Sequence, residues 1–306
     1  MAQPVKSSTN LNFNSITARV VMFSFSVVLF CSCASHDRKR TLPSLAVDLT
    51  KLEILSRGRI GLSAVNTKSG EHFQFRANER FPFCSTFKVI VVAAILEKSG
   101  RDAAFFRKRI LFSKKEVEFA GYAPVTGTRY AEGMSIADLC AAAIQHSDNG
   151  AANLLIKQLG GIEAISDFAS RTGDKAFRLD RWEPELNSAE PKDLRDTTIP
   201  AAMEETLKQI LLGDVLPISQ RQQLQKWLAG NKTGAKRIRA GLSDAWTVGD
   251  KTGTCSYGTT NDVGIISSSV DGPIVIAIFF TQDEKDAKPR DDVIASAAQL
   301  LSERLK

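Results

Sequence analysis

The sequence predicts a mixed α/β protein of the α+β type. One antiparallel sheet is built from both chain ends with flanking helices, and an all-α domain is inserted between them. Strand-like segments occur before residue 76 and again after residue 245, whereas the chain from 85 to about 230 is mostly helical in its pattern. Strands at both ends with helices between them favour a sheet that unites the termini. The expected domains are an α/β domain of residues 36–76 and 231–306, and an all-α domain of residues 77–230.

Length and composition narrow the classes of protein. A chain of 306 residues can bury a large core. The net charge of +6 is mild and the basic residues are scattered, so no nucleic-acid binding is predicted. The three histidines, His36, His72 and His146, stand in no ligand cluster, so no metal or other cofactor is expected.

The first 35 residues have the layout of a secretory signal peptide. A polar segment containing Lys6 and Arg19 precedes a largely apolar run at 20–30, and small residues follow it. The apolar run is too short to span a bilayer comfortably. A short membrane anchor is the alternative, and lipid attachment at Cys33 is a third. We therefore expect an exported, periplasmic protein.

The elements that follow are predicted in order. Leucines at helical spacing predict a helix over 42–56. A strand at 58–65, a turn at 68–71 and a return strand at 72–75 form a hairpin. The clearest later helices lie at 85–98, 135–145, 149–159, 161–171, 198–212 and 217–229. Strands are then expected at 246–252, 261–266 and 274–280, and a closing helix at 290–304.

One segment of the helical region fits neither pattern. Residues 178–197 contain Pro184, Pro191 and many charges, which predicts a long ordered loop. Loops of that length inside a compact domain are usually functional.

Ser85 and Lys88 stand three residues apart at the head of the predicted helix 85–98. Positions i and i+3 share one helix face, so the hydroxyl and the ammonium can meet. A lysine activates a serine only if its surroundings lower the pKa of the amine. Alone, this pair is more typical of a polar helix end.

Three further motifs have ordinary structural explanations when taken singly. Ser147–Asn149 is typical of a helix cap. Lys251–Gly253 ends a predicted strand, where glycine lets a ligand approach the backbone. Glu183 and Asn187, in the long loop, could hold one water between a carboxylate and an amide.

Together the four motifs carry a specific resemblance. The order S-x-x-K, S-D-N, K-T-G matches class A β-lactamases and penicillin-binding proteins, and the glutamate-bearing loop is the class A addition. The chain resembles the class A serine β-lactamases over nearly all of residues 42–304. The resemblance implies the serine β-lactamase/penicillin-binding-protein-like fold, β-lactam substrates, no cofactor, no stable protein partner and a monomer.

The resemblance also implies catalytic roles. Ser85 should attack the β-lactam carbonyl and become acylated, with Lys88 sharing in its activation. Ser147 should pass a proton to the departing ring nitrogen. Glu183 should activate the deacylating water, which Asn187 helps to position. Whether Lys88 or Glu183 is the acylation base stays open.

The remaining site residues follow from the same resemblance. Asn149 should contact the side-chain amide of the substrate, and Lys251 and Thr252 should lie near its carboxylate. The backbone N–H groups of Ser85 and Thr254 should form the oxyanion hole. The other matched positions are Tyr122 at the entrance, Arg237 behind the carboxylate site, and the loop pair Arg181 and Asp196.

Export would leave three cysteines, Cys84, Cys140 and Cys255, and the residues alone do not choose a pair. The resemblance does. In class A enzymes with carbapenemase-type activity, a disulfide joins the residue before the nucleophile to the residue two beyond K-T-G. That implies a Cys84–Cys255 bridge, a free Cys140 and turnover of carbapenems.

Two alternatives share most of these motifs. A penicillin-binding D,D-peptidase has the serine, lysine and K-T-G but lacks a deacylation base. A non-hydrolysing β-lactam sensor is acylated and stays so. The loop that carries Glu183 and Asn187 favours a β-lactamase over both.

Overall fold

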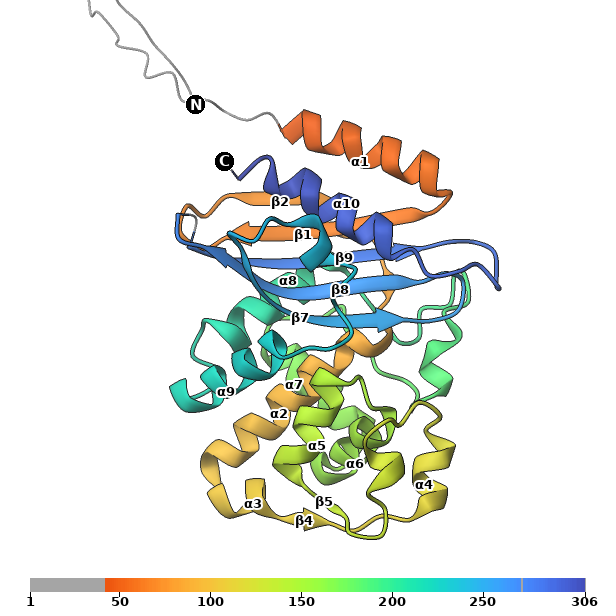
Figure 1. The fold of residues 1–306 in the computed structure, drawn as a ribbon, viewed down its shortest axis with the longest axis vertical. Helices are drawn as coiled ribbons and strands as arrows, with labels where there is room; N and C mark the ends of the chain where they lie inside the picture. Colours follow the sequence, from red (N-terminus) through yellow and green to blue (C-terminus); the bar gives the residue numbers. More distant parts are fainter. Residues whose placement is uncertain (1–41, 271, 306) are drawn as a thin grey trace, which may run out of the picture. The chain divides into compact units, whose positions relative to one another are not determined.

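The computed structural model describes residues 42–270 and 272–305 (Figure 1). The predicted signal peptide, with its membrane-anchor and lipid-attachment alternatives, lies outside these residues. Within them, no helix is both long and apolar enough to cross a membrane. Residues 40–306 form one compact unit, so the expected domain boundaries near 76 and 230 stay predictions.

A five-stranded antiparallel sheet unites the two chain ends. Its strand order is β2-β1-β9-β8-β7, and β9 lies beside β1, with Val275 opposite Val65. The strands are β1 (Arg59–Asn66), β2 (His72–Phe75), β7 (Thr247–Thr254), β8 (Thr260–Ser268) and β9 (Gly272–Thr281). The predicted fold class is therefore confirmed.

Strand β9 shows how the sheet separates two apolar layers. Ile274, Ile276, Ile278 and Phe280 pack in one cluster with side chains of α1 (Leu42–Ser56) and α10 (Asp291–Ser302). The alternate residues Val275, Ala277 and Phe279 belong to the other cluster, which includes the remaining helices. Successive side chains of a strand point to opposite faces, so a wholly apolar strand is buried on both sides (Figure 1).

The helical layer agrees with most of the predicted elements. Its helices are α2 (Lys88–Arg101), α3 (Ala103–Arg107), α4 (Lys114–Phe119), α5 (Ile136–Gln145), α6 (Asn149–Leu159), α7 (Ile162–Arg171), α8 (Pro200–Leu211) and α9 (Ile218–Ala229). The short helices α3 and α4 were not predicted. The start predicted at 198 is wrong, because Thr197–Thr198 pairs as a strand with Phe81–Pro82 and Pro200 then opens α8.

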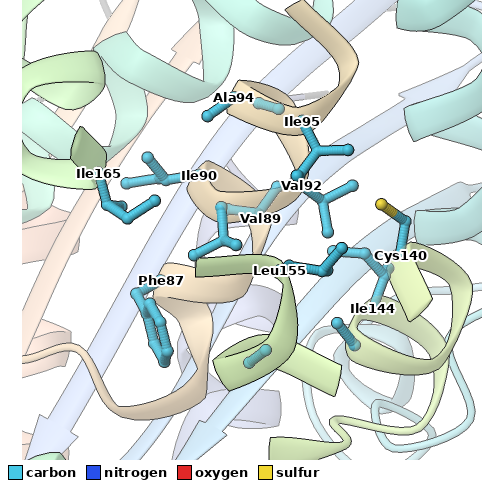
Figure 2. Packing of buried hydrophobic residues seen from close by; sticks show 14 of the residues in the cluster. Phe87, Val89, Ile90, Val92, Ala94, Ile95, Cys140, Ile144, Leu155 and Ile165 are labelled. Atoms are coloured by element: carbon cyan, nitrogen blue, oxygen red, sulfur yellow. The ribbon is translucent and has the colours of Figure 1, made fainter. Parts of the chain in front are cut away.

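Helix α2 lies at the centre of this layer. Val89, Ile90, Val92 and Ile95 are fully buried, and side chains from α5, α6 and α7 surround them (Figure 2). A helix that is apolar on every side is a core helix. Its first residue is therefore held in a fixed place, close to the segment that carries Ser85.

Candidate active site

Ser85 lies in a 3₁₀ turn, Cys84–Phe87, that leads directly into α2. The predicted start of an α-helix at 85 is therefore three residues early. Cys84 has a φ of 49°, a left-handed conformation that a non-glycine residue adopts only at some cost. The turn and α2 bring the two side chains together, and Lys88 Nζ donates to Ser85 Oγ at 2.9 Å.

Lys88 is wholly buried and makes several polar contacts. Its Nζ donates to Ser147 O at 2.8 Å and to Asn149 Oδ1 at 2.6 Å. It also lies 3.0 Å from Glu183 Oε1. Burial lowers the pKa of Lys88, and the Glu183 carboxylate opposes that shift. A lysine whose pKa is lowered can exchange a proton with Ser85.

Glu183 reaches Ser85 from the long loop. Its Oε1 accepts a long hydrogen bond from Ser85 Oγ at 3.4 Å, and its Oε2 accepts a short one from Asn187 Nδ2. Asn153 on α6 holds the backbone of Glu183 from behind. Asn153 Oδ1 accepts from Glu183 N at 3.1 Å, and Nδ2 donates to Glu183 O at 2.9 Å. Glu183 is thus held by hydrogen bonds both to its backbone and to its carboxylate.

The two ends of this loop are tied together as the sequence indicates. Arg181 Nε donates to Asp196 Oδ2 at 2.6 Å. Asp196 Oδ1 also accepts from the backbone N–H groups of Asp180 and Arg181, at 2.8 and 3.0 Å. Burial raises the pKa of Asp196, and these donors oppose the shift. The pair closes the loop that carries Glu183.

Ser147 and Asn149 come from the turn between α5 and α6. Ser147 has a φ of 56°, and its Oγ accepts from Lys251 Nζ at 2.9 Å. Asp148 caps α6 by accepting from Ala151 N at 2.8 Å. The capping explanation therefore applies, and the same turn brings Ser147 and Asn149 into contact with Lys251 and Lys88.

Lys251 is fully buried on β7. Burial, together with the charges of Lys88 and Arg237, lowers its pKa well below the ordinary lysine value. Its neighbour Thr252 shares a hydrogen bond of 2.5 Å with Thr233 Oγ1. Sequence reasoning missed Thr233, although it stands in a second Lys-Thr-Gly tripeptide at 232–234, because only the tripeptide at 251–253 ends a predicted strand.

Arg237 is buried beneath the edge of β7. Nη1 donates to Gly253 O at 2.8 Å and to Asn261 O at 2.7 Å, and Nη2 donates to Thr254 Oγ1 at 2.6 Å. Nε donates to Asp291 Oδ1 at 2.7 Å. Its planar guanidinium thus fixes the end of the strand that carries Lys251.

A cleft of about 490 Å³ opens at this point. Its lining includes the predicted residues Ser85, Tyr122, Ser147, Asn149, Asn187, Arg237, Thr252, Thr254 and Cys255. Lys88, Glu183 and Lys251 are buried outside this lining, where they contact Ser85 or Ser147. Tyr122 is 58% exposed, as expected of an entrance residue.

Ser256 also lines the cleft and was missed from sequence. Its backbone N–H donates to Asn187 O at 3.1 Å. The hydrogen bond joins the segment after K-T-G to the loop across the cleft.

Cys84 and Cys255 form a disulfide, with their Cα atoms 5.7 Å apart. The predicted pairing is confirmed, and Cys140 is the free cysteine among the residues that the structure describes, with its thiol buried (Figure 2). The bridge ties the turn that carries Ser85 to the residue that follows β7. Among residues 42–305, with 271 set aside, no cluster of histidine, cysteine and acidic side chains could hold a metal ion.

A serine that accepts a hydrogen bond from a buried lysine and faces a glutamate-bearing loop is the arrangement expected of a penicillin-recognising serine hydrolase. Residues 44–305 match the family model described as the β-lactamase enzyme family. The chain is 46% identical to β-lactamase OXY-2 of Klebsiella oxytoca, over 84% of this chain and 88% of that one. It is 44% identical to an imipenem-hydrolyzing β-lactamase of Enterobacter cloacae, over 85% and 89%.

Solved structures agree with these relatives. The β-lactamase from Streptomyces albus G is 44% identical, with a TM-score of 0.84, covering 86% of this chain and all of that one. A β-lactamase from Desulfarculus baarsii is 45% identical, with a TM-score of 0.84, over 87% and 98%. The chain belongs to the β-lactamase enzyme family, and it is a class A β-lactamase.

Proposed function

We propose that this β-lactamase opens the β-lactam amide through a covalent acyl-enzyme on Ser85, and that water activated by Glu183 releases the acyl group. The observation that carries the proposal is the contact of Lys88 Nζ with both Ser85 Oγ, at 2.9 Å, and Glu183 Oε1, at 3.0 Å. A nucleophile and two proton acceptors meet at one point.

In acylation, Ser85 Oγ attacks the β-lactam carbonyl carbon while its proton passes to Lys88, or through water to Glu183. The carbon–nitrogen bond then breaks. The departing ring nitrogen takes a proton from Ser147, whose Oγ already accepts a hydrogen bond from Lys251. The proton that left Ser85 is then passed from the base to Ser147, so both groups end this half-reaction in their starting protonation states. The product of this half-reaction is an ester on Ser85 with the ring opened.

In deacylation, a water between Glu183 and Asn187 attacks the ester carbonyl. Glu183 takes the proton of the water and Ser85 leaves with a proton, which restores the free enzyme. Two backbone donors, from Ser85 and Thr254, stabilise the oxyanion in both halves. Each such donor typically contributes about 3 kcal/mol to the transition state.

The proposed substrates are penicillins, cephalosporins and carbapenems, and the biological outcome is β-lactam resistance. Thr252 and Arg237 line the cleft, and the buried Lys251 contacts Ser147 of the same lining; these polar and cationic groups suit the carboxylate that these antibiotics share. Carbapenem turnover is supported by the Cys84–Cys255 bridge and by the imipenem-hydrolyzing relative. Imipenem hydrolysis by the purified protein tests carbapenem turnover. A rate no higher than that of spontaneous hydrolysis in buffer would refute it.

The variant Glu183→Ala distinguishes the proposed β-lactamase mechanism from a D,D-peptidase or a non-hydrolysing sensor. The variant should be acylated by a penicillin and then remain so, which intact-protein mass measurement detects as a stoichiometric adduct. Unchanged steady-state turnover would contradict the role of Glu183. A D,D-peptidase or a sensor would instead trap the adduct already in the unsubstituted protein.

We also propose that the protein is exported to the periplasm as a monomer after losing the N-terminal segment. The layout of residues 1–35 supports export. The mass of the protein isolated from a periplasmic extract shows whether the N-terminal segment has been cleaved and whether a lipid is attached at Cys33. A protein retaining residue 1 and found only in the cytoplasm would overturn this.

A further inference from the structure

A second cavity lies on the helical layer, between α4 and α6, with a volume of about 410 Å³. Val117 and Leu154 are buried at its base, and Phe119, which is 61% exposed, forms a wall with the half-buried Trp182. None of its lining residues belongs to the active-site cleft. Helices α4 and α6 lie against each other in the same unit (Figure 1).

The charges around this α4–α6 groove leave one cation without a partner. Lys157 Nζ lies 2.7 Å from Glu116 Oε1. That hydrogen bond, followed by those from Ser113, lowers the pKa of Glu116 to about 2, so its charge is present and already paired. Lys115 is exposed and has no ion pair or hydrogen bond to any residue that the structure describes. The lining therefore carries one positive charge in excess.

Apolar walls of Phe119, Trp182 and Leu154 suit a flat aromatic body, and the excess charge at Lys115 suits a single anionic group. We propose that the α4–α6 groove binds small aromatic anions, and that their binding slows release of the acyl group from Ser85. The second half of this proposal rests on the function proposed above.

Two residues that line the groove also contact or adjoin Glu183, which connects ligand binding to catalysis. Trp182 directly precedes Glu183 in the chain. Asn153 also lines the groove, and its side chain makes both hydrogen bonds that hold the Glu183 backbone. A ligand that displaces either wall moves the carboxylate relative to the Ser85 ester. Misplacement of a catalytic group by about 1 Å can cost on the order of 100-fold in rate.

The first experiment measures binding with 1-anilinonaphthalene-8-sulfonate, which has an aromatic body and one sulfonate. At 0.15 M salt we expect saturable emission with a dissociation constant on the order of tens of micromolar, as for ligands of this size. Energy transfer from tryptophan should accompany it. Trp182→Phe should remove most of that transfer, although Trp227 and Trp246 remain.

Matched variants locate the site. Lys115→Glu and Phe119→Ala should each weaken binding about tenfold. Lys114→Glu, on the same helix, and Leu111→Ala, which is 76% exposed outside the groove, should leave binding within twofold. Cooperative thermal unfolding of each variant excludes dye uptake by a loosened core. Equal binding by all four variants, or no binding by the native protein, would overturn the site.

The second experiment measures hydrolysis of a chromogenic cephalosporin, read in the visible. The dye should lower kcat and KM together, and the acyl-enzyme should accumulate by mass, because only the second half-reaction is slowed. In Lys115→Glu the same effect should require about tenfold more dye. Binding without any change in kcat would refute the coupling. Absence of hydrolysis without dye would instead count against the proposed function, leaving the binding result intact.

Discussion

Asn153 provides the sharpest test of how the fold supports catalysis. Its side chain is only 8% exposed and is the partner of both the N–H and the C=O of Glu183. Asn153→Ala leaves both groups buried without their donor or acceptor. Each such group costs about 1–3 kcal/mol, so the expected loss of stability is about 2–6 kcal/mol.

The kinetic effect should fall mainly on deacylation. Lys88 stays anchored to Ser147 O and Asn149 Oδ1 in the variant, so Ser85 can still be activated. Glu183 loses its main-chain support and with it the placement of the attacking water. We expect kcat to fall about 10- to 100-fold, kcat/KM to change less than about threefold, and the acyl-enzyme to accumulate.

Burst kinetics and intact-protein mass measurement provide the assay, and Glu53→Ala is the matched control. Glu53 is also 8% exposed, and it accepts from Ile60 N at 2.7 Å and from Arg76 Nε at 2.8 Å, outside the cleft lining. Its loss should cost comparable stability without trapping the acyl-enzyme. If kcat/KM of Asn153→Ala falls as far as kcat and no adduct appears, the reasoning is refuted.

Three further predictions concern the strand that carries K-T-G. Cys255→Ser opens a loop of 171 residues, which chain-entropy estimates value at about 5 kcal/mol. The urea midpoint of the variant should therefore fall. If a reductant leaves the urea midpoint of the unsubstituted protein unchanged, the stabilising role of the disulfide is contradicted. Lys251 binds an anion when protonated and its pKa is lowered, so KM for carboxylate substrates should rise with pH below the usual lysine range. Lys251→Arg should flatten that rise; an unaltered profile counts against the assignment. Arg237→Ala should raise KM about tenfold, because Gly253 O and Asn261 O lose their hydrogen-bond donor. If Arg237→Lys restores KM fully, the planar geometry of the guanidinium is unimportant.

Sequence patterns predicted β9 most clearly because it is a continuous apolar run, whereas the other strands of the sheet contain polar residues. Residues 274–280 contain only apolar side chains and form the middle of β9. Helices α3 and α4 have five and six residues, which is too short for a 3.6-residue period to stand out. The predicted start of α2 was early because its first turn is 3₁₀, and spacing alone does not separate that turn from an α-helix.

The site was predictable where its residues form motifs and not where they act through the backbone. Ser85 and Lys88 share a helix start, so their spacing predicted that the two side chains can meet, but only the combination with the other three motifs indicated a site. Asn153 and Ser256 instead hold the main chain of the loop from elements far away in sequence. Such contacts depend on the packing of α6 and β7 against the loop, and no local pattern encodes them.

Burial is what turns these motifs into a reactive site. Lysine is ordinarily a surface residue, yet Lys88 and Lys251 are both fully buried. Lys88 lies 2.9 Å from Ser85 Oγ, and Glu183 Oε1 lies 3.4 Å from the same oxygen, so either group is within reach of the hydroxyl proton. Loss of Glu183 should therefore abolish deacylation and leave an acylation step whose remaining rate measures the share of Lys88. A Glu183→Ala protein that acylates at an undiminished rate assigns the base to Lys88, whereas one that acylates far more slowly assigns it to Glu183.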